Sequence, residues 1–460
     1  MASEKNSPLL RQIGFLGATA LVVSNMVGTG IFTSTGFLAG DLGQVNVILG
    51  IWVVGAICAL AGALCYSELG INYPSSGGEY VYLTQAFGPT WGFMCGWISF
   101  FAGFSAPIAL TSLAFSEYVS YFFPAVRQSN SATFGPAGFQ LQIGPAQYLA
   151  CGLIGVFTLL NFFGVKRVAR IQTALTGVKL VVILSFIVLG LFFGKGDWAN
   201  FAKDAVRTSP NTIPEQFLVS LVWIYVGYSG WNAATYVAEE IRKPEETLPR
   251  ALAFGTLLVT VLFLLLNVVF IYAVPLEQMK GVLAVGTLTA KALFGPEIAG
   301  IFGAFMAMSL MATVNAMVTI GPRVYYAMAK NKAFFSFAAE VNEKWRTPVN
   351  AIVMQGICSM LMTMTPFTQL LTYIGFLLNI FTVLAVASLF VFRGRPGWQK
   401  LGILSFGWPA IPAFYVIAGS LVTFYALRVK PEVSLAGALT MAVGAAAFHF
   451  SGLAKRGKAA

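Results

Sequence analysis

Two glycine-bearing interruptions of long apolar stretches are the segments of this chain best suited to bind a ligand. One reads Gly-Thr-Gly at 28–30, and the other reads Gly-Tyr-Ser-Gly at 227–230. Glycine tolerates the backbone angles that end a helix, and a break frees N–H groups on one half and C=O groups on the other. The positive end of a half-helix suits a carboxylate, and freed carbonyls suit an ammonium. A pocket between two such breaks would therefore complement the zwitterionic head of an α-amino acid.

Close packing of helices is the alternative explanation for these glycines, because small residues let two helix backbones approach each other in a membrane. The two breaks, however, lie at matching positions in the two halves of the chain. Transporters built from inverted repeats place broken helices at corresponding positions, with the substrate between them near the bilayer midplane. Freed backbone groups in lipid are costly unless protein, water or a ligand satisfies them, so the paired breaks favour a binding site.

A lysine in the middle of an apolar stretch is the second candidate for chemistry. Lys179 follows Thr-Gly-Val and precedes Leu-Val-Val, and a charged side chain inside a membrane indicates a function by default. It would hold a fixed positive charge where another transporter holds a sodium ion, or it would exchange a proton. The alternative is a side chain that extends to the cytoplasmic face. Ser309 and Thr313, four residues apart, share one helix face; they either hydrogen-bond between helices or act near Lys179.

The elements that must position these residues are membrane-spanning helices. The chain has 460 residues, of which 57% are hydrophobic and 10% are charged, against roughly 25% charged in an ordinary soluble protein. This composition predicts an all-α integral membrane protein and excludes a disulfide-rich, a collagen-like and a disordered chain. A span needs about 20 apolar residues, which gives about 12 spans. They are predicted at 12–38, 44–70, 89–122, 144–163, 166–193, 212–238, 247–273, 296–327, 348–365, 367–392, 404–427 and 432–450.

The distribution of basic residues predicts the orientation of the chain. An even number of spans puts both ends on one side, and the loops on that side carry about twice as many Lys and Arg residues as the opposite loops. We therefore expect cytoplasmic tails at 1–11 and 451–460, in the cell membrane. The net charge of +11 is explained by these loops, so membrane lipid and not nucleic acid is the expected surrounding partner.

Motifs for cofactor chemistry are missing from the sequence. There is one histidine, His449, and the five cysteines fall inside apolar stretches, where cysteine acts as a small hydrophobic residue. A zinc-type site is therefore not expected. The sequence contains no Gly-x-x-x-x-Gly-Lys-Ser/Thr, His-Glu-x-x-His or Gly-x-Ser-x-Gly pattern. We expect no cofactor, no metal and no enzymatic activity.

The motifs at both breaks resemble a known family. Gly-Thr-Gly-Ile-Phe at 28–32 is similar to a signature of the amino acid–polyamine–organocation (APC) superfamily. The stretch 228–252, with Gly-Trp-Asn at 230–232 and Leu-Pro-Arg-Ala at 248–251, resembles its L-type amino acid transporters. The resemblance covers essentially all of 12–450.

For the architecture, the resemblance implies the leucine-transporter-type arrangement of five plus five inverted spans. The first repeat would be 12–193 and the second 212–392, with two further spans in 404–450. Extended to the site, the resemblance implies that the substrate carboxylate meets the backbone N–H groups and hydroxyl at Thr29 and Gly30.

Further roles are implied for the residues around the breaks. Gly28 would allow close approach of the substrate, Gly227 would line the same site, and Asn232 would support it. Lys179 matches a lysine that bridges spans 1 and 8 in sodium-independent members. The α-amine would meet the carbonyls of Met26, Val226 and Ser229.

Two departures from the family pattern bear on partner and substrate. Animal light subunits carry a cysteine after span 3 that bonds a heavy-chain partner, and 124–143 has none, so no disulfide-linked heavy subunit is expected. Val226 stands where many relatives have a bulky Phe.

The breaks carry no evident charge, so neutral L-amino acids are the expected substrates, moved by exchange or proton coupling. A cationic amino acid or polyamine carrier is the alternative, followed by an ion channel.

Overall fold

The computed structural model describes most of the chain and is predominantly helical. The predicted tails at 1–11 and 451–460 lie outside the described residues, apart from Arg11. The described residues are 11, 13–74, 77–136, 139–163, 165–330, 334–342 and 347–450.

The helices of the first half follow the apolar stretches of the sequence. In chain order the elements are α1 (Phe15–Met26), α2 (Gly30–Leu42), α3 (Val45–Asn72), α4 (Glu79–Phe87), α5 (Pro89–Ile98), the π-helix η1 (Ser99–Ser105), α6 (Ala106–Val119), the 3₁₀ turns η2 (Pro124–Val126) and η3 (Gln128–Asn130), the strands β1 (Ala132–Phe134) and β2 (Leu141–Ile143), α7 (Pro145–Leu160), the 3₁₀ turn η4 (Asn161–Phe163) and α8 (Val165–Phe193).

The second half repeats this pattern of long apolar helices joined by short segments. Its elements are the 3₁₀ helix η5 (Trp198–Ala202), α9 (Ile213–Tyr228), the 3₁₀ helix η6 (Ala233–Glu240), α10 (Pro244–Ala273), α11 (Leu276–Met279), α12 (Val285–Phe294), α13 (Pro296–Lys330), the 3₁₀ turn η7 (Ser336–Ala339), α14 (Val349–Met362), α15 (Phe367–Phe392), α16 (Gly402–Phe406), α17 (Ala410–Val429) and α18 (Pro431–Phe450).

The long apolar helices confirm a membrane protein with several spans. Within the described part of the chain, 8 helical segments are long and apolar enough to cross a membrane: α1 with α2, α3, α5 through α6, α10, α13, α15, α17 and α18. The predicted spans at 144–163 and 348–365 correspond to the shorter apolar helices α7 and α14, and the predicted span at 166–193 corresponds to α8, whose apolar part is Gly177–Phe193. The predicted span at 212–238 is α9 followed by η6. The layout of twelve spans in two inverted repeats stays a prediction.

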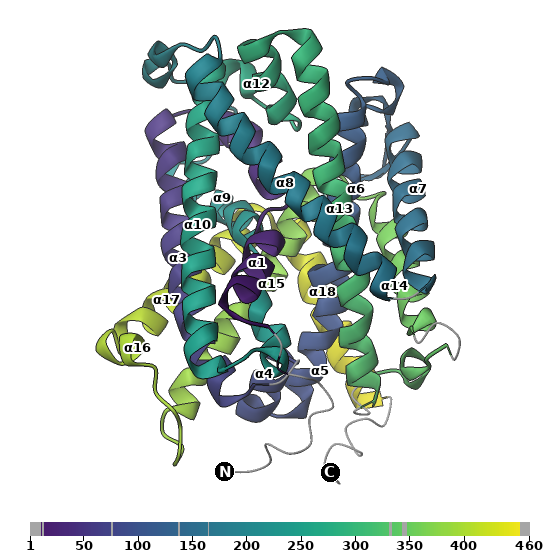
Figure 1. Ribbon diagram of the computed structural model, residues 1–460, viewed down its shortest axis with the longest axis vertical. Coiled ribbons are helices and arrows are strands. Elements are labelled where there is room, and N and C mark those ends of the chain that lie inside the picture. Colours follow the sequence, from purple (N-terminus) through teal and green to yellow (C-terminus); the bar gives the residue numbers. More distant parts are fainter. Residues whose placement is uncertain are drawn as a thin grey trace.

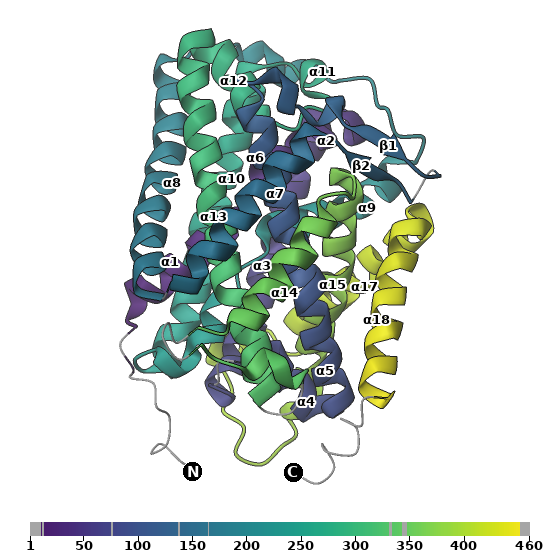
Figure 2. The ribbon, with the colours of Figure 1, turned by 90° about the vertical axis from the view of Figure 1, so that its right-hand side faces the viewer.

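The helices stand in a bundle that brings distant segments together. In Figure 1, α8 runs diagonally across the bundle, and it packs against α13 and α10. The pair α2 and α9 also lie against each other, as do α1 and α10. Both views place α4 and α5 at one end of the bundle and α12 at the other (Figures 1 and 2). The first residues of α1 and the last residues of α18 point toward the end that holds α4 (Figure 2), which agrees with an even number of crossings.

Three details differ from the expected all-α layout. In the loop at 124–143, β1 and β2 form a short antiparallel hairpin, because two exposed extended segments satisfy each other's backbone groups. The predicted single span at 89–122 contains η1, just before Pro107, which has no N–H to donate to the carbonyl four residues earlier. The predicted span at 404–427 is divided into α16 and α17 near Pro409. Between α3 and α5 the chain forms the short helix α4.

Candidate functional site

The first predicted interruption is confirmed, and it separates α1 from α2. Val27 adopts φ −76° and ψ 82°, and the Gly28 N–H donates to the Met26 carbonyl at 2.8 Å. This is an inverse γ-turn, which ends α1 within one residue. Thr29 precedes α2 without capping it through its side chain. The first backbone N–H groups of α2, which have no partner within the helix, are therefore not satisfied by that hydroxyl.

The second predicted interruption is confirmed as well, and it separates α9 from η6. The N–H and the hydroxyl of Ser229 both donate to the Val226 carbonyl, at 3.1 and 2.7 Å. Gly230 has φ +100°, a left-handed conformation that favours glycine over any other residue. The chain therefore leaves the helix at Tyr228, turns through Gly230 and resumes as the narrower 3₁₀ helix η6.

The two interruptions touch each other, although they are far apart in the sequence. A methyl group added at Gly30 would come within 2.3 Å of the Gly227 Cα atom, and one added at Gly230 within 2.8 Å of the Asn25 carbonyl carbon. Any side chain at these positions would overlap the opposite backbone, so glycine is what permits the contact. The breaks therefore form one site, with the start of α2 against the end of α9.

Lys179 reaches from α8 into the first break. Its side chain is 1% exposed, and its Nζ atom donates to the Val27 carbonyl at 2.7 Å and to the Thr313 hydroxyl at 2.9 Å. The first acceptor lies at the end of α1 and the second on α13. One ammonium thus joins three helices, and its positive charge lies against the negative end of α1. The alternative of a lysine that extends to the cytoplasmic face does not describe this geometry.

The other predicted site residues lie near the breaks but differ in what they contact. Ser309 is buried one turn before Thr313 on α13, and its hydroxyl has no hydrogen-bond partner among the described residues. Val226 is partly buried and packs beside Gly375 of α15. Asn232 lies in the second break, and its amide donates to Glu79 of α4 at 2.8 Å.

Sequence reasoning missed two residues that hold the breaks. Val27, not singled out from the sequence, supplies the carbonyl that Lys179 binds. Glu79 is buried and accepts hydrogen bonds from the second break and from η6. The signal for Glu79 was the Gly-Gly pair directly before it at 77–78, which indicates a close approach of another segment.

At the α4 end of the bundle, a buried charged side chain forms an ion pair and hydrogen bonds that hold separate segments together. Glu68, at the end of α3, forms a buried ion pair with Arg393, whose nitrogen lies 2.5 Å from the carboxylate. The same carboxylate accepts from the Trp398 indole and the Leu401 N–H. These bonds hold the segment that follows α15 against the end of α3.

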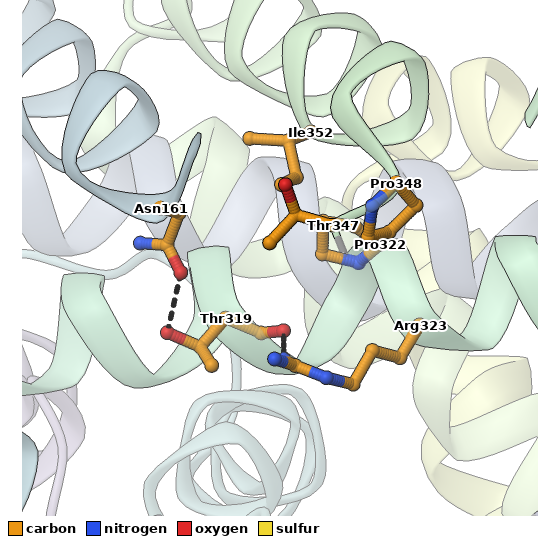
Figure 3. A pocket seen from close by; sticks show the side chains of 7 residues that line it. All are labelled: Asn161, Thr319, Pro322, Arg323, Thr347, Pro348 and Ile352. Carbon is orange, nitrogen blue, oxygen red and sulfur yellow. Dashed lines mark hydrogen bonds between the residues drawn. The ribbon is translucent and has the colours of Figure 1, made fainter. Parts of the chain in front are cut away.

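A small recess lies between η4, α13 and α14, and hydrogen bonds connect residues that line it (Figure 3). Thr319 donates to the Asn161 side chain at 2.9 Å, and the Arg323 guanidinium donates to the Thr319 carbonyl. The first bond connects η4 to α13, and the second lies within α13. The lining residues are Asn161, Thr319, Pro322, Arg323, Thr347, Pro348 and Ile352.

A multi-span helical protein whose broken helices meet at one site has the features of the membrane transporters that use discontinuous helices. The sequence model for the amino acid permease family matches residues 13–447 of this chain. The chain therefore belongs to the amino acid permease family, within the APC superfamily. It is an amino acid transporter and not an enzyme, as the sequence motifs predicted.

Similar proteins come from animals and from a bacterium. The chain is 29% identical to the large neutral amino acids transporter small subunit 2 of Homo sapiens, over 95% of this chain and 79% of the relative. It is 29% identical to the serine/threonine exchanger SteT of Bacillus subtilis, over 92% of this chain and 94% of the relative. It is 28% identical to the b(0,+)-type amino acid transporter 1 of Mus musculus, over 85% and 77% respectively.

Proposed function

We propose that this transporter moves neutral L-amino acids by alternating access, independently of sodium, by exchange or with coupled protons. The observation that carries the proposal is the contact between Gly30 and Gly227. It brings the first turn of α2, which carries free N–H groups, against the last turn of α9, which carries free carbonyls. Donors and acceptors of opposite polarity, freed by two breaks, suit the carboxylate and the ammonium of one amino acid.

Each end of the substrate has its own partners in this proposal. The carboxylate binds the first N–H groups of α2 at Thr29 and Gly30. The ammonium binds carbonyls of the breaks, and here the Val226 carbonyl already accepts two hydrogen bonds from Ser229. A carbonyl has two lone pairs, so the ammonium competes with the Ser229 hydroxyl at Val226, whereas Met26 accepts one bond from Gly28 and keeps a second acceptor position.

The charges around the breaks support neutral substrates and sodium independence. Neither 25–32 nor 225–232 contains a charged residue, so a cationic side chain would find no counter-ion in these segments. The Lys179 ammonium occupies the space between Val27 and Thr313. A fixed positive charge at this point repels a sodium ion. The names of two relatives, a large neutral amino acids transporter and a serine/threonine exchanger, support the same substrate class.

We further propose the setting in which the chain works. It lies in the cell membrane with both ends in the cytoplasm, so α4 is on the cytoplasmic side, and 12–193 and 212–392 are the two inverted repeats. It works without a disulfide-linked heavy subunit, because 124–143 contains no cysteine.

Counterflow in proteoliposomes tests the proposal directly. Purified protein is reconstituted with an unlabelled neutral amino acid inside, and uptake of labelled amino acid is competed with a panel of neutral, cationic and anionic amino acids. We expect neutral L-isomers to compete best and D-isomers poorly. Replacing external sodium with choline should leave uptake unchanged, since Lys179 supplies the positive charge. Best competition by lysine or arginine, or loss of uptake without sodium, would contradict the proposal; liposomes without protein are the control.

A further inference from the structure

A buried carboxyl group on α4 joins three elements at the cytoplasmic end of the proposed transporter. Glu79 is 8% exposed. Its Oε1 atom accepts from the Tyr66 hydroxyl of α3 at 3.0 Å and from the Asn232 amide at 2.8 Å. Its Oε2 atom accepts from the Tyr236 hydroxyl of η6 at 2.5 Å. One side chain therefore ties the second break and the segment after it to α4 and α3.

The backbone before Glu79 is shaped to receive η6. Gly78 has φ +49°, and a methyl group there would lie 2.4 Å from the Tyr236 ring. Only glycine combines this conformation with such close approach of a ring. The Tyr236 side chain thus docks on Gly78 with its ring and on Glu79 with its hydroxyl, so η6 is held to α4 at two adjacent points.

The surroundings of Glu79 offer hydrogen bonds but no opposite charge. Among the described residues no lysine, arginine or histidine forms an ion pair with it. Burial raises the pKa of the Glu79 carboxyl above its ordinary value, and the hydrogen bonds from Tyr236, Tyr66 and Asn232 lower it in part. The titratable groups that interact with Glu79 are all uncharged at neutral pH: Tyr66 on α3, Tyr82 on α4, Cys95 on α5, Tyr236 on η6 and Tyr415 on α17.

Both protonation states of Glu79 fit these partners. As a carboxylate it accepts all three hydrogen bonds. As an acid it donates through Oε2 to the Tyr236 oxygen, which is also an acceptor, while Oε1 still accepts from Tyr66 and Asn232. The proton therefore changes the charge of the joint and not its contacts. Since a buried carboxylate without a cation is costly, the charge decides whether the joint stays closed.

We propose that Glu79 is a proton-binding site that controls the cytoplasmic gate, an inference that rests on the proposed function. A proton taken from cytoplasmic water onto a carboxylate oxygen keeps η6 docked on α4. Loss of that proton to water leaves a buried charge, which is relieved when η6 separates and water reaches the carboxylate. The affinity for the proton is higher in the docked state, so low internal pH favours the closed gate and rising internal pH favours opening.

An internal-pH series of counterflow tests this site. External pH is fixed and internal pH is varied for the wild type, Glu79→Gln, Glu79→Asp and Glu117→Gln. Glu117 is the matched control, because it also accepts a hydrogen bond, from the Gln128 N–H, but at the end of α6 remote from α4. We expect the wild-type rate to rise at least about threefold from an internal pH of about 6 to about 8, as one titrating group allows.

The variants separate a proton site from a structural joint. Glu79→Gln should lose the pH dependence, since the amide stays neutral, while Glu79→Asp and Glu117→Gln should keep it. A full wild-type pH profile in Glu79→Gln, or a wild-type rate that does not rise with internal pH, would overturn the inference. Counterflow at one fixed pH reports the proposed function separately, so each proposal is able to fail without the other.

Tyr236→Phe gives a second test if Glu79→Gln does not fold. It keeps the ring against Gly78 and removes only the hydroxyl that bonds Oε2. Because that hydrogen bond lowers the pKa of Glu79, its loss should move the midpoint of the internal-pH profile to higher pH. An unchanged or lowered midpoint would contradict the assignment.

Discussion

The two breaks are held in place by different chemistry, although they share one contact. The first is fastened from outside: the Lys179 ammonium of α8 binds the Val27 carbonyl and a hydroxyl of α13. The second is held by its own Ser229, which caps Val226, and by neutral donors to Glu79. A charged hydrogen bond in a dry interior is stronger than a neutral one. The first break is therefore firmly tied to the bundle, and the second is held more weakly, by its own hydroxyl and by neutral donors.

Disturbing the contact between the two breaks should give the largest loss of counterflow. Gly30→Ala puts a methyl group 2.3 Å from the Gly227 Cα atom, which forces the two backbones apart. Overpacking of this kind costs about 3 kcal/mol, so counterflow should fall roughly 100-fold. The matched control is Gly50→Ala on α3, where a methyl group meets nothing within 4 Å and activity should be kept. Wild-type counterflow by Gly30→Ala would remove the contact from the site.

Removing the Lys179 ammonium, which binds the first break, should give the second-largest loss of counterflow. Lys179→Met keeps the length and packing of the side chain but leaves the Val27 carbonyl and the Thr313 hydroxyl without their donor. A hydrogen bond to a charged group contributes about 1.5–3 kcal/mol, so substrate counterflow should fall roughly 10- to 100-fold. Lys291→Met, at an exposed position on α12, should behave as the wild type. If both lysine variants transport equally well, the first break does not depend on the cation.

Removing the Ser229 hydroxyl, which bonds the Val226 carbonyl in the second break, should give the smallest loss of counterflow. Ser229→Ala removes the hydroxyl bond to Val226 but keeps the N–H bond to the same carbonyl. A neutral hydrogen bond contributes about 0.5–1.5 kcal/mol, so counterflow should change by only about 2- to 10-fold. Ser120→Ala is the matched control, since its hydroxyl also donates at 2.7 Å to a carbonyl three residues earlier. A larger loss for Ser229→Ala than for Lys179→Met would reverse the comparison between the two breaks.

The sequence by itself determined the membrane location, most helix boundaries and the two breaks. Apolar stretches of span length cannot face water, and glycines at 28–30 and 227–230 act on the backbone where they stand. These are local properties, so they can be recognised without knowing which segments meet. The family, too, was recognisable from short motifs at the breaks.

Only the tertiary structure decided what the breaks and the polar side chains contact. Lys179 was visible as an intramembrane charge, but its acceptors on α1 and α13 depend on how α8 crosses the bundle. Asn232 was expected to support the site, and only helix packing brings Glu79 to its amide. Glu79 resembles an ordinary surface charge in sequence, and it becomes buried only because α3, η6 and α4 close around it. Burial and hydrogen-bond partners come from segments that are distant along the chain, so no local pattern specifies them.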